Sequence, residues 1–253
     1  MNEPSPRFWE IFFDVYEHLP RQGPGSKSCA AQALALCSEL PTQPEILDLG
    51  CGVGCQTLYL SELTAGSITA IDNHAPSIDR LQETIVKLEL TSRIKAVVAD
   101  MAAPNQVPES FDLIWSEGAL YSIGLRSALK VCHELLRPAG YIAFTDAIWR
   151  KENPPPAVKA SFDLDYPTMG WLKDDLAAIK DCGFELIGHF TLPDEAWWQD
   201  FYTPMEVRIS VLRTKYAKDT EALAVLDQIA EEPEMHRRSS DYYAYEFFIA
   251  RRT

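Results

Sequence analysis

The sequence predicts an α/β fold with a doubly wound, mostly parallel sheet of seven strands. Short runs rich in β-branched and aromatic residues alternate with helical stretches from residue 45 onward, and a glycine-rich turn follows the first run. This alternation is typical of βαβ units, which cover both faces of a parallel sheet with helices. Ligands bind such sheets beyond the carboxyl ends of the strands. The expected strands cover residues 45–49, 67–71, 94–99, 111–115, 141–147, 184–192 and 243–250.

Two helices are expected before the first strand. Residues 7–19 place aromatic and aliphatic side chains at helical spacing, which indicates an amphipathic helix with one buried face. Two glycines and two prolines in residues 20–25 exclude regular structure there. Ser26 is well placed to cap a second helix that runs to about residue 40.

The segments after the fifth strand predict additions to the sheet. Residues 151–166 are expected to form a proline-rich loop, followed by a helix over 169–182. Helical patterns over 205–216 and 219–229 make the connection between the last two strands too long for a hairpin. We therefore expect a helical insertion over residues 193–240.

A chain of 253 residues can bury one substantial core, and we expect a single domain. Its parts are expected to be an N-terminal helical cap (1–44), a ligand-binding core (45–192), the insertion acting as a lid (193–240) and the last strand (241–253). The minimal core needs neither the cap nor the insertion, so both are free to shape a second binding site.

The composition limits the partners that we expect. A formal net charge of −14 would repel a nucleic-acid backbone, and no apolar run approaches the roughly 20 residues that a membrane helix needs. The six cysteines include no CxxC pair, the five histidines lie far apart, and residues 1–19 lack the pattern of a signal peptide. We expect a cytoplasmic protein with a small-molecule partner, without nucleic acid, membrane or metal, and leave a homodimer open.

The strongest motif is a glycine-rich turn directly after the first strand. Residues 45–58 have the sequence EILDLGCGVGCQTL, which puts Gly50, Gly52 and Gly54 at alternate positions between an apolar strand and a helix. Glycine lets the backbone turn sharply and approach a ligand closely, so that the helix N-terminus can meet polar atoms. Because one such turn is weak evidence, the ends of the next strands decide its meaning.

Polar residues follow the next three strands. Asp72 and Asn73 end the second strand, Asp100 and Met101 follow the third, and Ser116-Glu117-Gly118 follow the fourth. The carboxylate of Asp72 can accept hydrogen bonds from both hydroxyls of a ribose. Each carboxylate could instead cap the helix after it, but the order of all these residues after a glycine turn favours a nucleoside site.

With these motifs in this order, the sequence resembles the class I S-adenosylmethionine-dependent methyltransferases from Glu45 to the last strand. The resemblance implies a Rossmann-like fold with an antiparallel last strand, S-adenosylmethionine as cofactor and methyl transfer to an unidentified small molecule. Residues 19–26 and 116–124 look like a bacterial subgroup of small-molecule methyltransferases related to the ubiquinone-biosynthesis-like branch. Many relatives have Pro-Gly-Gly before the fifth strand, where this chain has Pro138-Ala139-Gly140.

The resemblance also implies where the cofactor binds. Gly50, Gly52 and Gly54 are expected to line its methionine portion, and Asp48 to orient the turn near its ammonium group. Beyond the turn, the expected cofactor-binding residues are Asp72 at the ribose, Asp100 and Met101 at the adenine, and Asn73 and Ser116 elsewhere in the site.

Glu117 is the predicted catalytic residue. The sulfonium of the cofactor is already an activated donor, so a base is needed only where the acceptor must lose a proton. Glu117 is the side chain best placed for this by topology, although a carboxylate at the start of a helix explains it equally well. Arg21 could meet the cofactor carboxylate, with Gln22 bonded nearby, or Arg21 could be a solvated turn residue.

Aromatic residues outside the core predict a pocket for the acceptor. Tyr16, Tyr121, Trp149 and Trp198 are expected to contact it, because aromatic side chains can wall off water from the reacting atoms. Aromatic residues belong to a core more often than to a ligand site, so packing remains the alternative.

Two other functions stay open. A nicotinamide-dependent oxidoreductase would share Gly50, Gly52 and Asp72, but its fingerprint needs a third glycine at position 55, which is a cysteine here. A protein that keeps the fold without methyl transfer could be an aminopropyl transferase, which resembles a pattern richer in acidic residues after the fourth strand, or a non-catalytic S-adenosylmethionine-binding protein. Production of S-adenosylhomocysteine in a metabolite extract would separate an enzyme from a binder.

Overall fold

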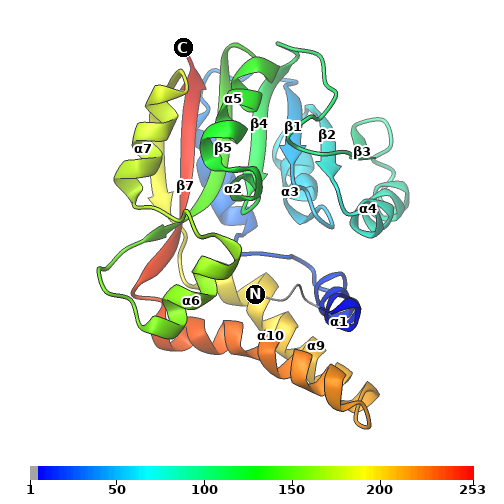
Figure 1. Cartoon of the computed structure of the whole chain (residues 1–253). Coiled ribbons are helices and arrows are strands. Elements are labelled where there is room, and N and C mark those ends of the chain that lie inside the picture. Colours follow the sequence, from blue (N-terminus) through cyan, green and yellow to red (C-terminus); the bar gives the residue numbers. More distant parts are fainter. Residues whose placement is uncertain (1–4) are drawn as a thin grey trace.

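One mixed sheet forms the centre of the molecule. The computed structural model describes residues 5–253, in which seven strands follow the order β3-β2-β1-β4-β5-β7-β6 (Figure 1). Strand β7 runs antiparallel to both of its neighbours, and the other pairs are parallel. This topology confirms the predicted fold. The strands are β1 (Glu45–Leu49), β2 (Ser67–Asp72), β3 (Ile94–Val98), β4 (Phe111–Glu117), β5 (Leu136–Trp149), β6 (Phe184–Thr191) and β7 (Tyr243–Arg252).

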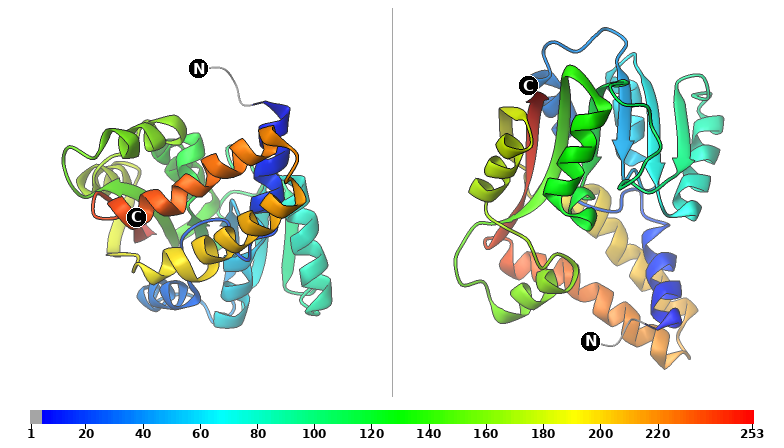
Figure 2. Two further views of the ribbon diagram at one scale, coloured as in Figure 1. Left: turned by 90° about the horizontal axis from the view of Figure 1, so that it is seen from below. Right: turned by 45° about the horizontal axis from the view of Figure 1, so that its top comes forward.

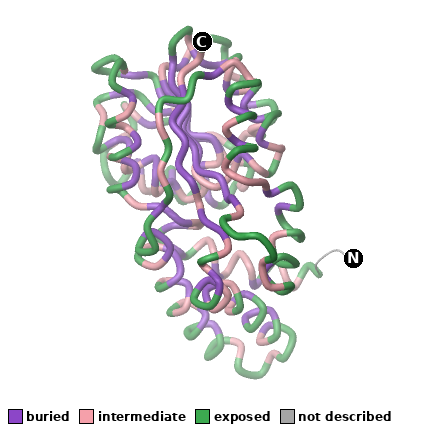
Figure 3. Tube along the Cα trace, turned by 90° about the vertical axis from the view of Figure 1, so that its left-hand side faces the viewer, coloured by how far each residue is buried: buried purple, intermediate pink, exposed green. Residues whose placement is uncertain are grey.

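Apolar side chains on both faces of the central strands pack against two layers of helices. In β1, Ile46 belongs to the core on one face and Leu47 to the core on the other, and both are fully buried. Figure 3 shows the strands as buried and much of the outer helical surface as exposed. One face is covered by α2 (Lys27–Leu36), α3 (Cys55–Leu63) and α4 (Ala75–Lys87), and the other by α5 (Leu125–Leu135) and α7 (Leu172–Asp181).

A helical cap lies at the end of the sheet toward which the parallel strands point. Figures 1 and 2 show α1, α9 and α10 crossing below this edge, with α6 beside them. Their shared core includes Ile11, Met205 and Leu226, all fully buried. The cap and its connections comprise α1 (Pro6–Tyr16), α6 (Pro156–Asp165), α8 (Glu195–Trp197), the π-helix η2 (Trp198–Tyr202), α9 (Thr203–Lys215) and α10 (Thr220–Ser239).

Within the described chain, no helix is both long enough and apolar enough to cross a membrane. All six cysteines are free. The division of the chain into cap, core, lid and last strand stays a prediction, and residues 1–4 of the expected cap lie outside the described residues.

Three expected helix boundaries were wrong. The second helix ends at Leu36. The expected loop over 151–166 contains α6, because proline is compatible with the first turn of a helix, and Pro156 begins α6. Helix α10 continues ten residues beyond 229 to Ser239, through the buried Pro233. Its buried stripe continues at helical spacing beyond the proline, so packing offsets the lost backbone hydrogen bond.

Buried carboxyl groups lie where α7 meets the sheet. Asp146 of β5 is paired across the sheet with Glu246 of β7, and it accepts a hydrogen bond of 2.9 Å from the hydroxyl of Tyr166. Asp175 of α7 is also buried, and its Oδ2 has no hydrogen-bond partner among the described residues. Burial and the nearby charge of Asp146 raise the pKa of Asp175 to about 8.

We expect the stability of the protein to depend on the protonation of Asp175. An acid whose folded pKa is raised stabilises the fold fully below its unfolded pKa of 3.8, and this stabilisation is lost as the pH rises to about 8. The melting temperature of the Asp175→Asn variant relative to the parent should therefore increase from pH 4 to pH 8. Thermal unfolding measures this difference, with the exposed Asp181→Asn as control. A difference that is constant with pH would contradict the prediction.

Candidate functional site

The glycine-rich turn between β1 and α3 forms the centre of the site. Gly50, Gly52 and Gly54 have φ angles of 71°, 52° and 88°, in the left-handed region that favours glycine. A Cβ atom on Gly50 would lie 2.4 Å from the Cβ of Ala119, and one on Gly52 would lie 2.4 Å from Oε1 of Gln22. The turn therefore requires glycine both for its conformation and for its close neighbours.

Gly54 has a different neighbourhood from the one we predicted. Its N–H donates to the carbonyl of Cys51 at 2.9 Å, and a Cβ atom on it would lie 2.2 Å from Cδ1 of Leu81 in α4. The missing side chain thus lets the start of α3 pack closely against α4. This position explains Gly54 by core packing instead of by contact with a ligand.

Asp48 bonds to residues at the start of α3, directly after the turn. Its buried carboxylate accepts hydrogen bonds from Oγ1 of Thr57 at 2.5 Å and from Nε2 of Gln56 at 3.4 Å. Burial raises the pKa of Asp48 to about 7, although the bond from Thr57 acts in the opposite direction. Asp48 therefore has the orienting part of its predicted role, while a contact with an ammonium group stays a prediction.

Asp72 lies beside the turn at the end of β2. Its Oδ2 accepts a hydrogen bond of 2.9 Å from the N–H of Gly52, and its Oδ1 accepts one of 2.8 Å from the N–H of His74. Each oxygen keeps a second lone pair, and the residue is only partly buried. Asp72 can therefore accept further hydrogen bonds from a ligand, while the adjacent Asn73 is exposed at the rim.

The end of β3 contributes one residue near the turn and one at the rim. The Cε of Met101 would lie 3.2 Å from a Cβ atom on Gly50, so this side chain borders the glycine turn. Asp100 is exposed, and its Oδ1 accepts a hydrogen bond of 2.8 Å from the N–H of Ala102. Both positions are compatible with the predicted adenine contacts.

Ser116 was predicted to bind the cofactor, but its side chain does not face the site. It is fully buried, and its hydroxyl donates to the carbonyl of Leu49 at 2.8 Å. Ser116 therefore joins the carboxyl ends of β4 and β1.

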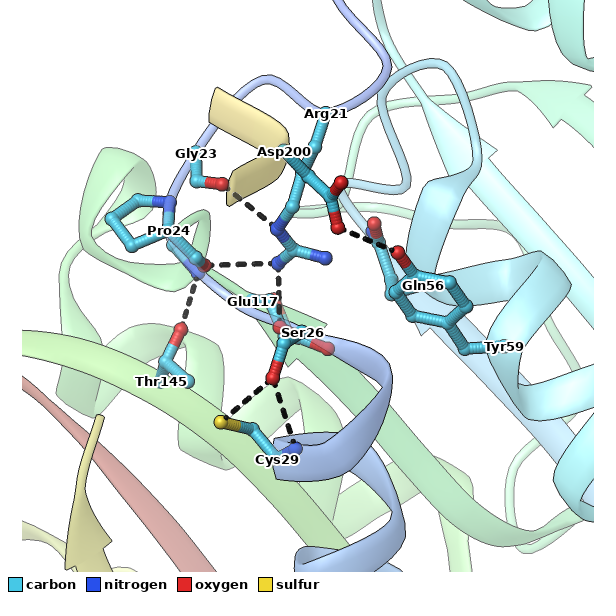
Figure 4. A network of polar contacts seen from close by, with 12 residues as sticks. Arg21, Gly23, Pro24, Ser26, Cys29, Gln56, Tyr59, Glu117, Thr145 and Asp200 are labelled. Carbon is cyan, nitrogen blue, oxygen red and sulfur yellow. Dashed lines mark hydrogen bonds and ion pairs between the residues drawn. The ribbon is translucent and has the colours of Figure 1, made fainter. Parts of the chain in front are cut away.

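A buried ion pair connects the loop after α1 to the end of β4 (Figure 4). Nη2 of Arg21 lies 2.5 Å from Oε2 of Glu117, and the two side chains are 4% and 1% exposed. The carbonyls of Gly23 and Pro24 accept further bonds from Arg21, of 2.8 Å and 3.0 Å. Nε1 of Trp115 donates to the other oxygen of Glu117 at 2.7 Å. Arg21 is therefore a buried residue and not a solvated one.

This pair changes the role that we expected for Glu117. Because both of its oxygens accept hydrogen bonds, one from Arg21 and one from Trp115, Glu117 is occupied by these side chains and is not directed at an acceptor. Nη1 of Arg21, in contrast, is buried and has no hydrogen-bond partner among residues 5–253. Figure 4 shows it directed away from Glu117, on the side of Gln56 and Tyr59. A free guanidinium N–H is suited to bind a carboxylate.

Gln22 connects the turn to the cap. Its Oε1 accepts a hydrogen bond of 3.1 Å from the N–H of Val53, and its Nε2 donates to the carbonyl of Tyr16 at 3.3 Å. The side chain of Tyr16 continues this contact into the cap, where its hydroxyl donates to Glu232 at 2.6 Å. Thus the predicted residues Arg21, Gln22 and Tyr16 all approach one edge of the sheet.

The other aromatic residues that we expected to contact the acceptor each pack against a different neighbour. The ring of Tyr121 lies 4.9 Å from that of Tyr166 and is partly buried. Trp149 packs against Phe162 of α6, and the guanidinium of Arg237 covers Trp198. These packing contacts favour the alternative of core and surface roles for the two tryptophans.

Glu232 and Tyr245 were not predicted from the sequence. Glu232 continues the helical spacing of the buried residues in α10. Because this helix was expected to end at residue 229, that spacing was not recognised. Tyr245 of β7 would lie 3.2 Å from a Cβ atom on Gly118, beside the end of β4. An alternating strand pattern gives no sign of this contact.

The site has the groups that an adenosyl amino acid requires. The glycine turn allows close approach, Asp72 offers hydrogen-bond acceptors, and Nη1 of Arg21 offers a buried donor for an anion. These groups fit S-adenosylmethionine.

Comparison with known proteins agrees with this interpretation. Residues 46–140 match the family described as "Methyltransferase domain". Sterol 24-C-methyltransferase erg-4 of Neurospora crassa is 25% identical over 218 residues, which are 78% of this chain and 58% of that protein. Malonyl-[acyl-carrier protein] O-methyltransferase of Salmonella typhimurium is 33% identical over 101 residues, 40% of this chain and 38% of that protein. The chain thus spans less than two thirds of either relative.

Solved structures share the fold along almost the whole chain. An S-adenosylmethionine-dependent methyltransferase from Thiobacillus denitrificans, solved with S-adenosyl-L-homocysteine, has a TM-score of 0.80 at 18% identity, covering 99% of both chains. One from Geobacter sulfurreducens, solved with the same ligand, has a TM-score of 0.80 at 18% identity, covering 95% of this chain and 97% of that one.

The Arg21–Glu117 pair should contribute strongly to stability. Glu117→Gln leaves the buried guanidinium without its anionic partner, and we expect a loss of about 3 kcal/mol in the free energy of unfolding. Chemical denaturation measures this loss. In the exposed pair of Lys27 and Glu62, the control variant Glu62→Gln should lose less than about 1 kcal/mol. Equal losses in the two variants would show that the buried pair has no special role.

Proposed function

We propose that this chain is a class I S-adenosylmethionine-dependent methyltransferase that transfers a methyl group to a small-molecule acceptor, which its match to a methyltransferase domain over residues 46–140 and its fold support. One observation carries the proposal: a left-handed glycine turn, a ribose-compatible carboxylate and a buried guanidinium with a free N–H meet at one edge of the sheet. An oxidoreductase would not need this guanidinium, so the alternative of nicotinamide chemistry is not favoured.

Each end of the cofactor has a proposed partner. Asp72 would accept hydrogen bonds from the ribose hydroxyls, and Nη1 of Arg21 would bind the carboxylate of the methionine portion. Asp100 and Met101, with Asn73 at the rim, would border the adenine. Glu117 would act on the cofactor only through Arg21, whose orientation it fixes, and is therefore a positioning residue.

The chemistry requires little from the protein beyond placement. When bound, S-adenosylmethionine supplies an activated methyl group on a sulfonium. The residues of this chain would hold the acceptor in line with that group and exclude water from it, which are large contributions for such a transfer. Because Glu117 is committed to Arg21, we assign no general base to the end of β4.

The cap is the proposed acceptor site and lid. The segment 7–25 and the insertion 193–240 meet below the carboxyl ends of the strands (Figure 1), and Tyr16 and Tyr121 pack against the hydrophobic core of the cap. We also infer a small-molecule acceptor and a cytoplasmic location from the net charge of −14 and the free cysteines. The expected homodimer and the bacterial subgroup stay predictions.

Binding of S-adenosylhomocysteine tests the cofactor site. Isothermal titration calorimetry of the purified protein should show binding, and Asp72→Ala should weaken it about tenfold or more, because charge-assisted hydrogen bonds are each worth roughly 1.5–3 kcal/mol. Asp79→Ala, an exposed carboxylate on α4, is the matched control and should change nothing. Unchanged affinity in the Asp72 variant would remove this residue from the site. Tight NADH binding without S-adenosylhomocysteine binding would refute the proposed function.

The glycine turn gives an independent test. Gly52→Val should abolish S-adenosylhomocysteine binding, because its side chain would enter the space beside the turn, where Gln22 already lies close. The protein should still fold, as circular dichroism can verify. Gly23→Ala serves as control, since nothing lies within 4 Å of the added atom. Retained binding in the valine variant would place the cofactor elsewhere.

A further inference from the structure

Basic side chains of the cap form ion pairs with acidic ones, so that their charges balance. These pairs include Arg208–Asp14 at 2.6 Å, Lys215–Asp14 at 2.7 Å, Arg213–Asp227 at 2.7 Å and Arg237–Glu206 at 2.6 Å.

One carboxylate of the cap has no basic partner among the described residues. Glu232 of α10 accepts hydrogen bonds from the hydroxyls of Tyr16 at 2.6 Å and Tyr202 at 3.1 Å. No lysine or arginine among the described residues forms an ion pair with Glu232. The charged group that acts on it most strongly is Asp165, which is also negative. His236, one turn further along α10, supplies no positive charge, because burial lowers its pKa.

Aromatic rings surround this carboxylate. The ring of Tyr16 stacks on that of Phe12 at 4.1 Å, and Tyr202 stacks on Phe201 at 4.6 Å. Tyr121 packs against the same hydrophobic cluster as Tyr16 and Tyr202. A negative charge among electron-rich rings is the chemistry that recognises an organic cation.

This inner cluster, Glu232 with Tyr16, Tyr121 and Tyr202, lies next to the cofactor site. Gln22 bonds both to the backbone of Tyr16 and to the glycine turn. A ligand bound at the cluster would therefore be near the end of the cofactor that the turn holds.

We propose that the acceptor is an organic cation, and that the inner cluster binds its positively charged group. Because a partly buried carboxylate without a cation is costly, a cationic ligand would supply the missing countercharge. The role of this cation as methyl acceptor rests on the proposed methyl transfer, but binding of a cation can be measured separately from methyl transfer.

The test uses two probes of similar shape and different charge. Tetramethylammonium and the neutral tert-butanol are titrated into the full-length protein, with and without S-adenosylhomocysteine, and bound probe is detected by saturation-transfer NMR. We expect tetramethylammonium to bind at least about tenfold more tightly than tert-butanol. Equal binding of the two probes by the parent protein would overturn the proposal without any variant.

Glu232→Gln then tests the residue itself. It keeps a hydrogen-bond acceptor for the tyrosines and removes the charge, so tetramethylammonium binding should fall about tenfold or more. Glu234→Gln is the matched control on the same helix, because Glu234 pairs with Arg237 at the surface. Unchanged binding in the Glu232 variant would overturn the proposal. S-adenosylhomocysteine binding without cation binding would refute only the cationic acceptor, and the reverse would refute only the cofactor site.

Discussion

The buried ion pair between Arg21 and Glu117 is the constraint on which the site depends. Two charges removed from water are stable only where their geometry is good and their other hydrogen-bonding groups are satisfied. The loop after α1 meets this condition by turning two carbonyls toward the guanidinium. Gly25 has to pass so close that a Cβ atom would lie 2.3 Å from Nη2 of Arg21. The glycines and prolines of this loop thus follow from the need to enclose one cation.

The same pair explains why binding, and not proton transfer, is the chemistry that the site supports best. Nε and Nη2 of Arg21 are fixed by Gly23, Pro24 and Glu117, which leaves one guanidinium nitrogen, Nη1, to face a ligand. Gln22, next in sequence, bonds to the glycine turn, so the loop, the turn and the cap form one connected unit. Catalysis by placement requires this rigidity, because small errors in the position of an acceptor cost much of the rate.

Much of the fold follows from local patterns, whereas the site depends on contacts across the chain. All seven strands were predicted, because buried parallel strands are short apolar runs and the last strand alternates. The order of the turn glycines and Asp72 along the sequence predicted that they lie side by side, as the bond from Gly52 to Asp72 shows. The pairing of Glu117 with Arg21 was not predicted because the two residues lie 96 positions apart, and no periodic pattern reports such a pairing. Helix α6 and the end of α10 were missed because proline was taken only as a helix breaker.

The contact between Tyr16 and Glu232 has a consequence for the order of folding. These residues are 216 positions apart, so α1 cannot complete its packing until α10 has been synthesised. Until then, the apolar face of α1, with Ile11 and Val15, lacks the part of its packing that α10 supplies and is available for chaperones or for aggregation. A chain that ends between α9 and α10 would also lack β7, so that β6 would have no strand to pair with and the cap would be open, a species that proteases can recognise.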